Sequence, residues 1–130
     1  MLLDTPFLVD LLRGDEEAVE CAAELEADLV QQRVSAMTLF ELFYGVARSD
    51  QPAEEREEIE AVLASKPVVE ADAAVMQRAG RLAGELAAEG VPVDDGDAVI
   101  AASALALDEP VLTRNVEHFE RFEGLGVESY

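Results

Sequence analysis

The chain has little positive charge and few residues that could cross-link it or bind a soft metal. Against 29 Asp and Glu stand nine Lys and Arg, so the net charge at neutral pH is −20. One cysteine, one histidine and no tryptophan occur among the 130 residues. The lone Cys21 excludes an intrachain disulfide, which fits a reducing compartment, and without clustered cysteine or histidine no zinc site is expected.

The scarcity of positive charge also bears on the partners of the chain. A surface of this sign normally repels nucleic acid and anionic membranes. Lys66 is the only lysine, and the excess of acid over lysine suggests adaptation to a very salty cytoplasm, in other words a halophilic protein. At molar salt the Debye length is only about 3 Å, so an RNA could still approach such a surface.

Length and hydropathy predict one folded domain over residues 1–130. Half of the residues are hydrophobic, which argues against disorder despite the charge. The first residues, Met1-Leu2-Leu3-Asp4, do not resemble a charged leader followed by an apolar segment, and no apolar run is long enough to cross a bilayer. We therefore expect a cytoplasmic protein without a membrane partner.

Short apolar runs alternate with longer helical patterns, which is typical of a parallel sheet covered by helices. The strands are expected at 1–3, 32–36, 67–69, 111–112 and 126–128, and the helices at 6–12, 16–29, 37–47, 71–89, 98–107 and 115–122, with a further acidic helix that ends near residue 65. The sequence thus predicts a single three-layer α/β/α domain around a central, mainly parallel sheet. In such a fold functional groups gather at the carboxyl ends of the strands.

Three isolated carboxylates stand in strongly apolar surroundings: Asp4, Glu41 and Asp97. Apolar neighbours on both sides imply backbone that enters the core, where an ionised carboxylate is costly unless it meets a cation or a partner charge. Oxygen ligands of this kind suit Mg²⁺ or Mn²⁺.

Each carboxylate also has a purely structural interpretation. Asp4 could cap a helix N-terminus, and Thr38 to Glu41 has the spacing of a capping box. Asp97 could be an acidic residue that a helix dipole favours. The apolar strand that leads into Asp4 and the buried helix that follows Asp97 favour the ligand for these two residues, whereas the residues alone leave both interpretations of Glu41 open.

Four segments together resemble the PIN-domain ribonucleases, and within them the VapC-type toxins of toxin–antitoxin pairs. They are Leu3-Asp4-Thr5, Thr38 to Leu42, Asp97 to Ala102 and Leu112 to Phe119. No single segment is specific, but their order and the chain length agree with the family. The resemblance implies a PIN-like fold, endonucleolytic hydrolysis of RNA that depends on Mg²⁺ or Mn²⁺, a homodimer, and inhibition by a VapB-like antitoxin.

The resemblance also assigns roles to residues. It makes Asp4, Glu41 and Asp97 the metal ligands and, with Asn115 at a position where the family carries Asp or Asn, the catalytic set. Supporting roles fall to Thr5, Asp95, Thr113, Arg114 and Glu117. Arg114 is expected to clamp a phosphate, its alternative being an ion pair with one of the many carboxylates. His118 is interpreted as an incidental surface histidine.

Two other functions compete with the nuclease. The first is a non-catalytic, acidic PIN-like module that binds a basic partner protein. The second is a phosphoryl-transfer domain of the receiver or phosphatase kind, which also places an Asp after the first strand. Such domains normally add a positioned lysine, whereas Lys66 precedes an expected edge strand, so this function ranks last.

Overall fold

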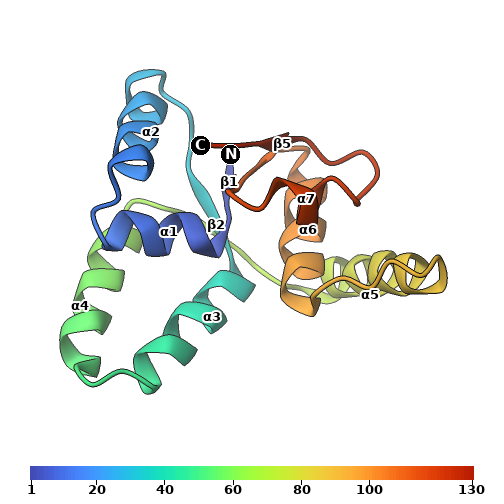
Figure 1. The fold of residues 1–130 in the computed structure, drawn as a ribbon, viewed down its shortest axis with the longest axis horizontal. Coiled ribbons are helices and arrows are strands. Elements are labelled where there is room, and N and C mark those ends of the chain that lie inside the picture. The colour runs from blue at the N-terminus through green and yellow to red at the C-terminus, as the bar shows by residue number, and fades with distance from the viewer.

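Five short strands form an all-parallel sheet in the order β3-β2-β1-β4-β5 in the computed structural model, which describes residues 1–130 (Figure 1). The strands are β1 (Leu2–Leu3), β2 (Arg33–Ser35), β3 (Val68–Val69), β4 (Val111–Leu112) and β5 (Val127–Glu128). The helices are α1 (Thr5–Leu12), α2 (Glu16–Ala27), α3 (Ala36–Ala47), α4 (Pro52–Leu63), α5 (Ala73–Ala88), α6 (Asp95–Leu107) and α7 (Val116–Phe119).

The central strand β1 is apolar because both faces of the sheet are covered. Leu2 and Leu3 are fully buried and belong to different core clusters, since successive side chains of a strand point to opposite faces. Leu2 pairs with Arg33 of β2 on one side and with Val111 of β4 on the other. As expected, β3 lies at an edge of the sheet.

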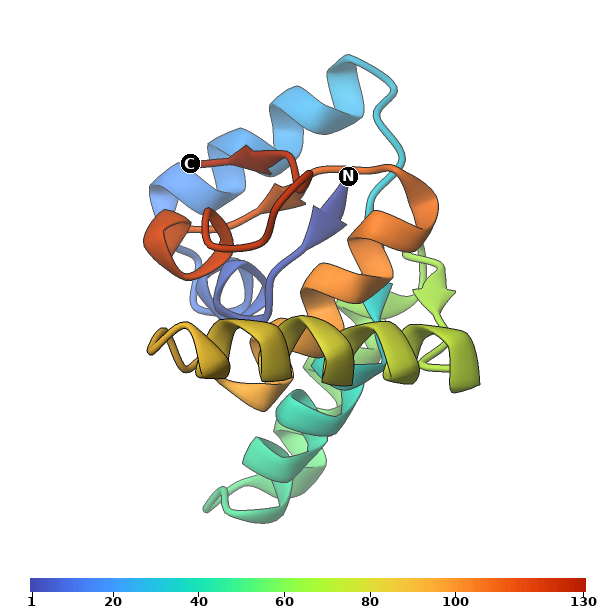
Figure 2. The ribbon, with the colours of Figure 1, turned by 90° about the vertical axis from the view of Figure 1, so that its right-hand side faces the viewer.

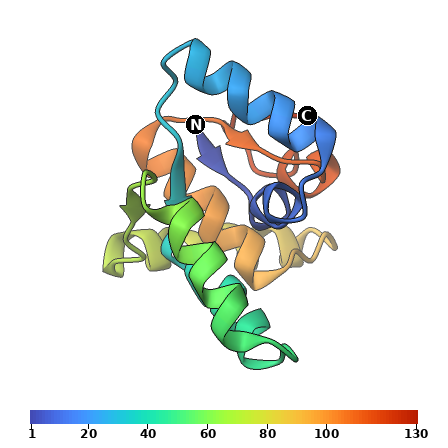
Figure 3. The same cartoon turned by 90° about the vertical axis from the view of Figure 1, so that its left-hand side faces the viewer.

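The two core clusters define the outer layers. Leu3 packs with residues of α1 to α4, among them Phe7 and Leu42, whereas Leu2 packs with residues of α5 to α7. Figures 2 and 3 view these two helical layers from opposite sides of the sheet. The predicted three-layer α/β/α fold is confirmed. No helix in the structure is both long and apolar enough for a membrane span.

Helix α6 is buried almost all round and lies under α5, as Figure 2 shows. Its Ala98, Ala101, Ala102 and Ala104 are small enough for close packing on both sides. It begins three residues earlier than predicted because the Asp94 carboxylate accepts hydrogen bonds from the backbone N–H of Gly96 and Asp97. Asp97 therefore lies inside the first turn of the helix.

Candidate active site

The candidate active site lies where the carboxyl ends of β1, β2 and β4 meet. From β1 the chain continues to β2 and β3 on one side of the sheet, and it later returns to β4 and β5 on the other. This change of direction makes the gap between β1 and β4 the topological switch point, where α/β folds bind ligands. Asp4 follows β1 and Thr113 follows β4, and the Asp4 N–H donates to the Leu112 carbonyl at 3.0 Å.

Asp4 is 2% exposed and held from two sides. The Thr113 hydroxyl donates to Oδ2 at 2.8 Å, and the Thr5 N–H donates to Oδ1 at 2.9 Å. Burial raises the pKa of Asp4 to about 6, against the two hydrogen bonds that lower it, and the charges of Asp97 and Glu41 raise it further. Asp4 is the N-cap of α1 as well, so its structural and its functional interpretation apply together.

Glu41 faces the same space from the second turn of α3. The Thr5 hydroxyl donates to its Oε1 at 2.9 Å and lies 3.0 Å from the Thr38 hydroxyl. Burial raises the pKa of Glu41, as do the charges of Asp94 and Asp97, while the Thr5 hydrogen bond lowers it. The N-cap of α3 is Ser35, with Thr38 inside the helix, so the capping-box interpretation of Glu41 does not apply.

Asp97 enters the site from the first turn of α6, and His118 of α7 lies against it. The Nδ1 atom of His118 is 3.2 Å from Oδ2 of Asp97. Burial and the charge of Asp94 raise the pKa of Asp97, whereas His118 and Arg121 lower it. The sequence offered only its single histidine as a signal, and the interpretation of His118 as incidental missed this contact.

These carboxylates form a concentration of negative charge. The charges of Asp97 and Glu41 raise the pKa of Asp4, and the charge of Asp97 also raises the pKa of Glu41. Glu41 lies close to the first turn of α6, because a Cβ placed on Gly96 would be 3.4 Å from its Oε2. No three Asp, Glu, His or Cys side chains are close enough together to bind one ion directly. Mg²⁺ keeps several waters and commonly takes one or two carboxylates, so this oxygen-only donor set, with its unneutralised charge, fits a hydrated divalent cation.

Of the residues expected to support the site, Thr113 contacts it through hydrogen bonds, whereas the side chains of Asn115, Asp95 and Glu117 are exposed. The Thr113 hydroxyl accepts from the Asn115 N–H at 2.9 Å while it donates to Asp4, so it ties the fourth position to the first. The Asn115 side chain is exposed and makes no hydrogen bond within the chain. Asp95 is exposed beside Glu41 in an open hollow that Phe40 and Tyr44 also line, and Glu117 is exposed on α7 without an ion pair.

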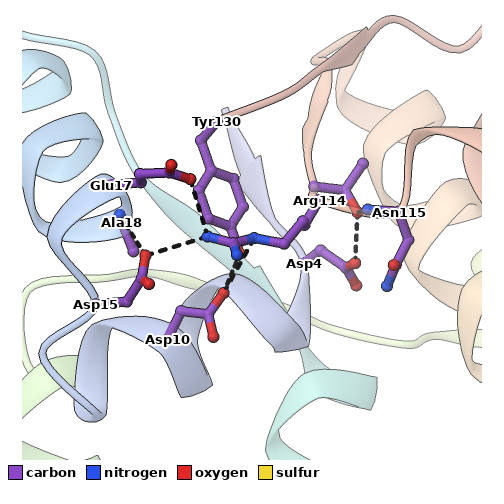
Figure 4. Close-up of polar contacts among 9 residues, drawn as sticks. Asp4, Asp10, Asp15, Glu17, Ala18, Arg114, Asn115 and Tyr130 are labelled. Carbon is purple, nitrogen blue, oxygen red and sulfur yellow. Dashed lines mark hydrogen bonds and ion pairs between the residues drawn. The ribbon is translucent and has the colours of Figure 1, made fainter.

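Arg114 turns away from the acidic cluster. Figure 4 shows its guanidinium directed toward α1 and α2, while Asn115 lies on the other side of the loop. It forms ion pairs with Asp10, Asp15 and Glu17, which matches the alternative interpretation rather than a phosphate clamp.

Two further observations concern residues outside the expected set. Thr38 was not foreseen as part of the site, because a threonine within a helix has no sequence signal for such a role. The ammonium group of Lys66 donates to the Val62 carbonyl at the end of α4, so no lysine accompanies the acidic cluster as a phosphoryl-transfer site would require.

Comparisons with known proteins agree on one family. The profile of the PIN domain matches residues 1–125. Ribonuclease VapC19 of Mycobacterium tuberculosis is 34% identical over 124 residues, which cover 95% of each chain. The tRNA(fMet)-specific endonuclease VapC of Shigella flexneri is 35% identical over 97 residues, 75% of this chain and 74% of that protein. The crystal structure of DNA-bound VapBC from Salmonella typhimurium superposes with a TM-score of 0.89 at 27% identity, covering 98% of this chain and 96% of that one.

Proposed function

The chain belongs to the PIN domain family, among the VapC proteins, and from this premise we propose that it is an endoribonuclease that depends on Mg²⁺ or Mn²⁺. The observation that supports the proposal is the meeting of Asp4, Glu41 and Asp97 at the switch point of the sheet. A divalent cation at these residues would activate a water molecule and stabilise the charge that develops on the phosphodiester.

The protein itself contributes position and charge. Thr5 and Thr113 hold Asp4 and Glu41 by hydrogen bonds, so these carboxylates keep their orientation when RNA approaches. Their repulsion makes the site attractive to a cation, which offsets the negative field that would otherwise repel phosphate. Asn115 adds an exposed amide near Thr113 that can donate to a phosphate oxygen.

We further propose that the chain is the toxin of a VapBC-type pair, inhibited by a VapB-like antitoxin, and that it forms a homodimer. The related structure from Salmonella typhimurium contains VapC with VapB. Phe40 and Tyr44 of α3 are 63% and 57% exposed with their rings stacked, and we assign this aromatic face to contact between two copies.

Light scattering at molar salt is expected to give the dimer mass; a monomer mass would contradict this assignment.

Cleavage of RNA tests the proposed activity. Because one relative is named for tRNA(fMet), we choose this tRNA as one assay substrate and an unstructured RNA as the other. We expect cleavage with Mg²⁺ or Mn²⁺ and none with a chelator. In Asp97→Asn the cleavage rate should fall by about 100-fold or more, because the side chain keeps its size but loses the charge that binds the metal ion. Calorimetry should show weaker Mn²⁺ binding in Asp4→Asn and Asp97→Asn.

The matched control is Asp50→Asn, since Asp50 is exposed in the α3–α4 turn and its carboxylate makes no ion pair. It should leave cleavage and Mn²⁺ binding unchanged. Cleavage that persists in chelator, or that survives Asp97→Asn, would contradict the proposal. Absence of cleavage by the wild-type protein with either metal ion would instead favour the alternative, a non-catalytic acidic PIN-like module that binds a basic partner protein.

A further inference from the structure

Arg114 is the centre of a polar cluster beside the candidate active site, which we name the Arg114 clamp: Arg114, Asp10, Asp15, Glu17 and Tyr130 (Figure 4). Its Nε lies 3.5 Å from Oδ2 of Asp10, and its Nη2 lies 3.1 Å from Oδ2 of Asp15. The guanidinium carbon also stands 4.8 Å from the centre of the Tyr130 ring. One side chain thus joins the loop after β4 to α1, to the start of α2 and to the C-terminal segment.

The clamp is anchored in the core. The Tyr130 hydroxyl donates to Oδ2 of Asp10 at 2.6 Å, which fixes the carboxylate that faces Arg114. The edge of the Tyr130 ring packs on Phe7 at 4.8 Å between ring centres, and Phe7 is fully buried. Burial, followed by the hydrogen bond to Asp10, raises the pKa of the Tyr130 phenol, so this donor keeps its proton throughout the neutral range.

Of the two neighbours of Arg114 in the chain, Thr113 contacts the acidic cluster directly and Asn115 is linked to it only through Thr113. Thr113 precedes Arg114 and donates to Asp4, while Asn115 follows it and is tied to the Thr113 hydroxyl. Thr113 and Asn115 therefore lie on the side of the acidic cluster, while Arg114 between them belongs to the Arg114 clamp. Because Arg114 is adjacent to Thr113, the ion pairs of Arg114 restrain the backbone from which the Thr113 hydroxyl meets Asp4.

We propose that Arg114 is a positioning residue, which acts through Thr113 and Asn115 to hold Asp4 in the geometry that binds the metal ion, with Asp10 and Tyr130 as its anchors. The inference rests on the proposed function. A phosphate would have to compete with the carboxylates of Asp10, Asp15 and Glu17 for this guanidinium, which disfavours direct contact with RNA. Arg114 is 45% exposed, and because exposed ion pairs add little stability, its main effect should lie in the site rather than in folding.

The test compares three variants: Arg114→Gln, Asp10→Asn and Tyr130→Phe. Asp10 is preferred to Asp15 because Asp15 also caps α2 through the Ala18 N–H. The readouts are Mn²⁺ affinity by calorimetry, kcat and KM for RNA, and the thermal unfolding midpoint. The control is Arg81→Gln, which breaks an exposed pair with Glu85 on α5 and should change no readout.

For Arg114→Gln and Asp10→Asn we expect Mn²⁺ affinity and kcat to fall by roughly tenfold, with KM nearly unchanged. Tyr130→Phe should give a smaller change in the same direction, because it keeps the ring and loses the donor to Asp10. The double variant of Arg114 and Asp10 should be no worse than either single one, because both act through one contact. Arg114→Lys should restore part of the loss, since it keeps the charge but not the planar fork.

Two results would overturn the proposal. A raised KM in Arg114→Gln alone, with Asp10→Asn and Tyr130→Phe unchanged, would show that the guanidinium contacts RNA. Lower unfolding midpoints with unchanged Mn²⁺ affinity and kcat would show that the clamp only stabilises the fold. If the wild-type protein cleaves no RNA, the proposed function fails, but calorimetry still decides whether the clamp positions the metal site.

Discussion

At the scale of single residues, hydroxyl groups organise the acidic cluster. Thr5 links the end of β1 to Glu41, and Thr113 links the end of β4 to Asp4. A threonine hydroxyl can direct a carboxylate without neutralising it, so the charge stays available for a cation. Burying these charges is unfavourable, and it raises the pKa of Asp4, Glu41 and Asp97.

The raised pKa of Asp4 predicts a pH dependence of stability in the absence of divalent metal. The pKa is about 6 in the folded chain, above its ordinary value of 3.8, so the folded state binds the proton more tightly than the unfolded state. Stability should therefore rise as the pH falls from 7 through 6 toward 4, by on the order of 3 kcal/mol from this residue. Denaturant unfolding in chelator at several pH values measures it.

The comparison variant for this effect is Asp4→Asn, which cannot ionise. Near pH 7 in chelator it should be more stable than the wild type, and the difference should shrink as the pH falls through about 6. A difference that is the same at pH 7 and pH 4 would show that the buried charge of Asp4 is not what strains the site.

At the scale of elements, the first turn of α6 combines three tasks. Asp94 caps the helix, Gly96 leaves room beside Glu41, and Asp97 supplies a carboxylate to the site. A buried helix of small residues behind this turn holds it rigidly against α5 and the sheet. The geometry of the site is thus tied to the packing of α6.

Replacing glycine by alanine at two positions distinguishes an effect on Mn²⁺ binding from an effect on helix stability. In Gly96→Ala the new Cβ would lie 3.0 Å from Oδ1 of Asp94 and 3.4 Å from Oε2 of Glu41, so we expect weaker Mn²⁺ binding and no gain in stability. Gly84→Ala is the matched control, because Gly84 lies within α5 with open space around its Cα. It should gain up to about 1 kcal/mol by helix propensity and leave Mn²⁺ binding unchanged. Thermal unfolding and calorimetry measure both effects, and equal stabilisation with intact Mn²⁺ binding in Gly96→Ala would contradict the expectation.

At the scale of the whole molecule, the net charge of −20 dominates. Besides the carboxylates around Arg114, only three form ion pairs: Glu85, Asp97 and Glu109, the last with two partners. Most of the acidic surface is therefore opposed only by water and salt. Self-repulsion of this kind destabilises the compact state and is screened by ions.

Salt should therefore stabilise the protein. We expect the thermal unfolding midpoint to rise between dilute and molar KCl, because screening removes the repulsion among unpaired carboxylates. Replacing Glu57 and Glu60 of the exposed face of α4 by Gln should raise the midpoint in dilute buffer and reduce its salt dependence. A midpoint that is flat or falls with KCl would remove the hypothesis of adaptation to high salt.

The sequence by itself determined the architecture of this protein. Short buried runs such as Leu2-Leu3 and Val111-Leu112, set between longer helical patterns, predicted the parallel sheet and both helical layers. It also singled out Asp4, Glu41 and Asp97, because carboxylates between apolar residues are costly to bury without a purpose. Local periodicity can be read from neighbours in the chain, which is why the prediction of the fold succeeded, whereas the roles of the three carboxylates stay a prediction.

Only the tertiary structure decided which side chains meet across the sheet. It placed Thr113 against Asp4 and His118 against Asp97, pairs that are 109 and 21 residues apart in the chain. It also turned Arg114 toward Asp10 and Tyr130, although its position beside Asn115 suggested a phosphate ligand. The direction of a side chain in a loop depends on the charges and rings that other elements bring to it, and no pattern within the loop itself contains that information.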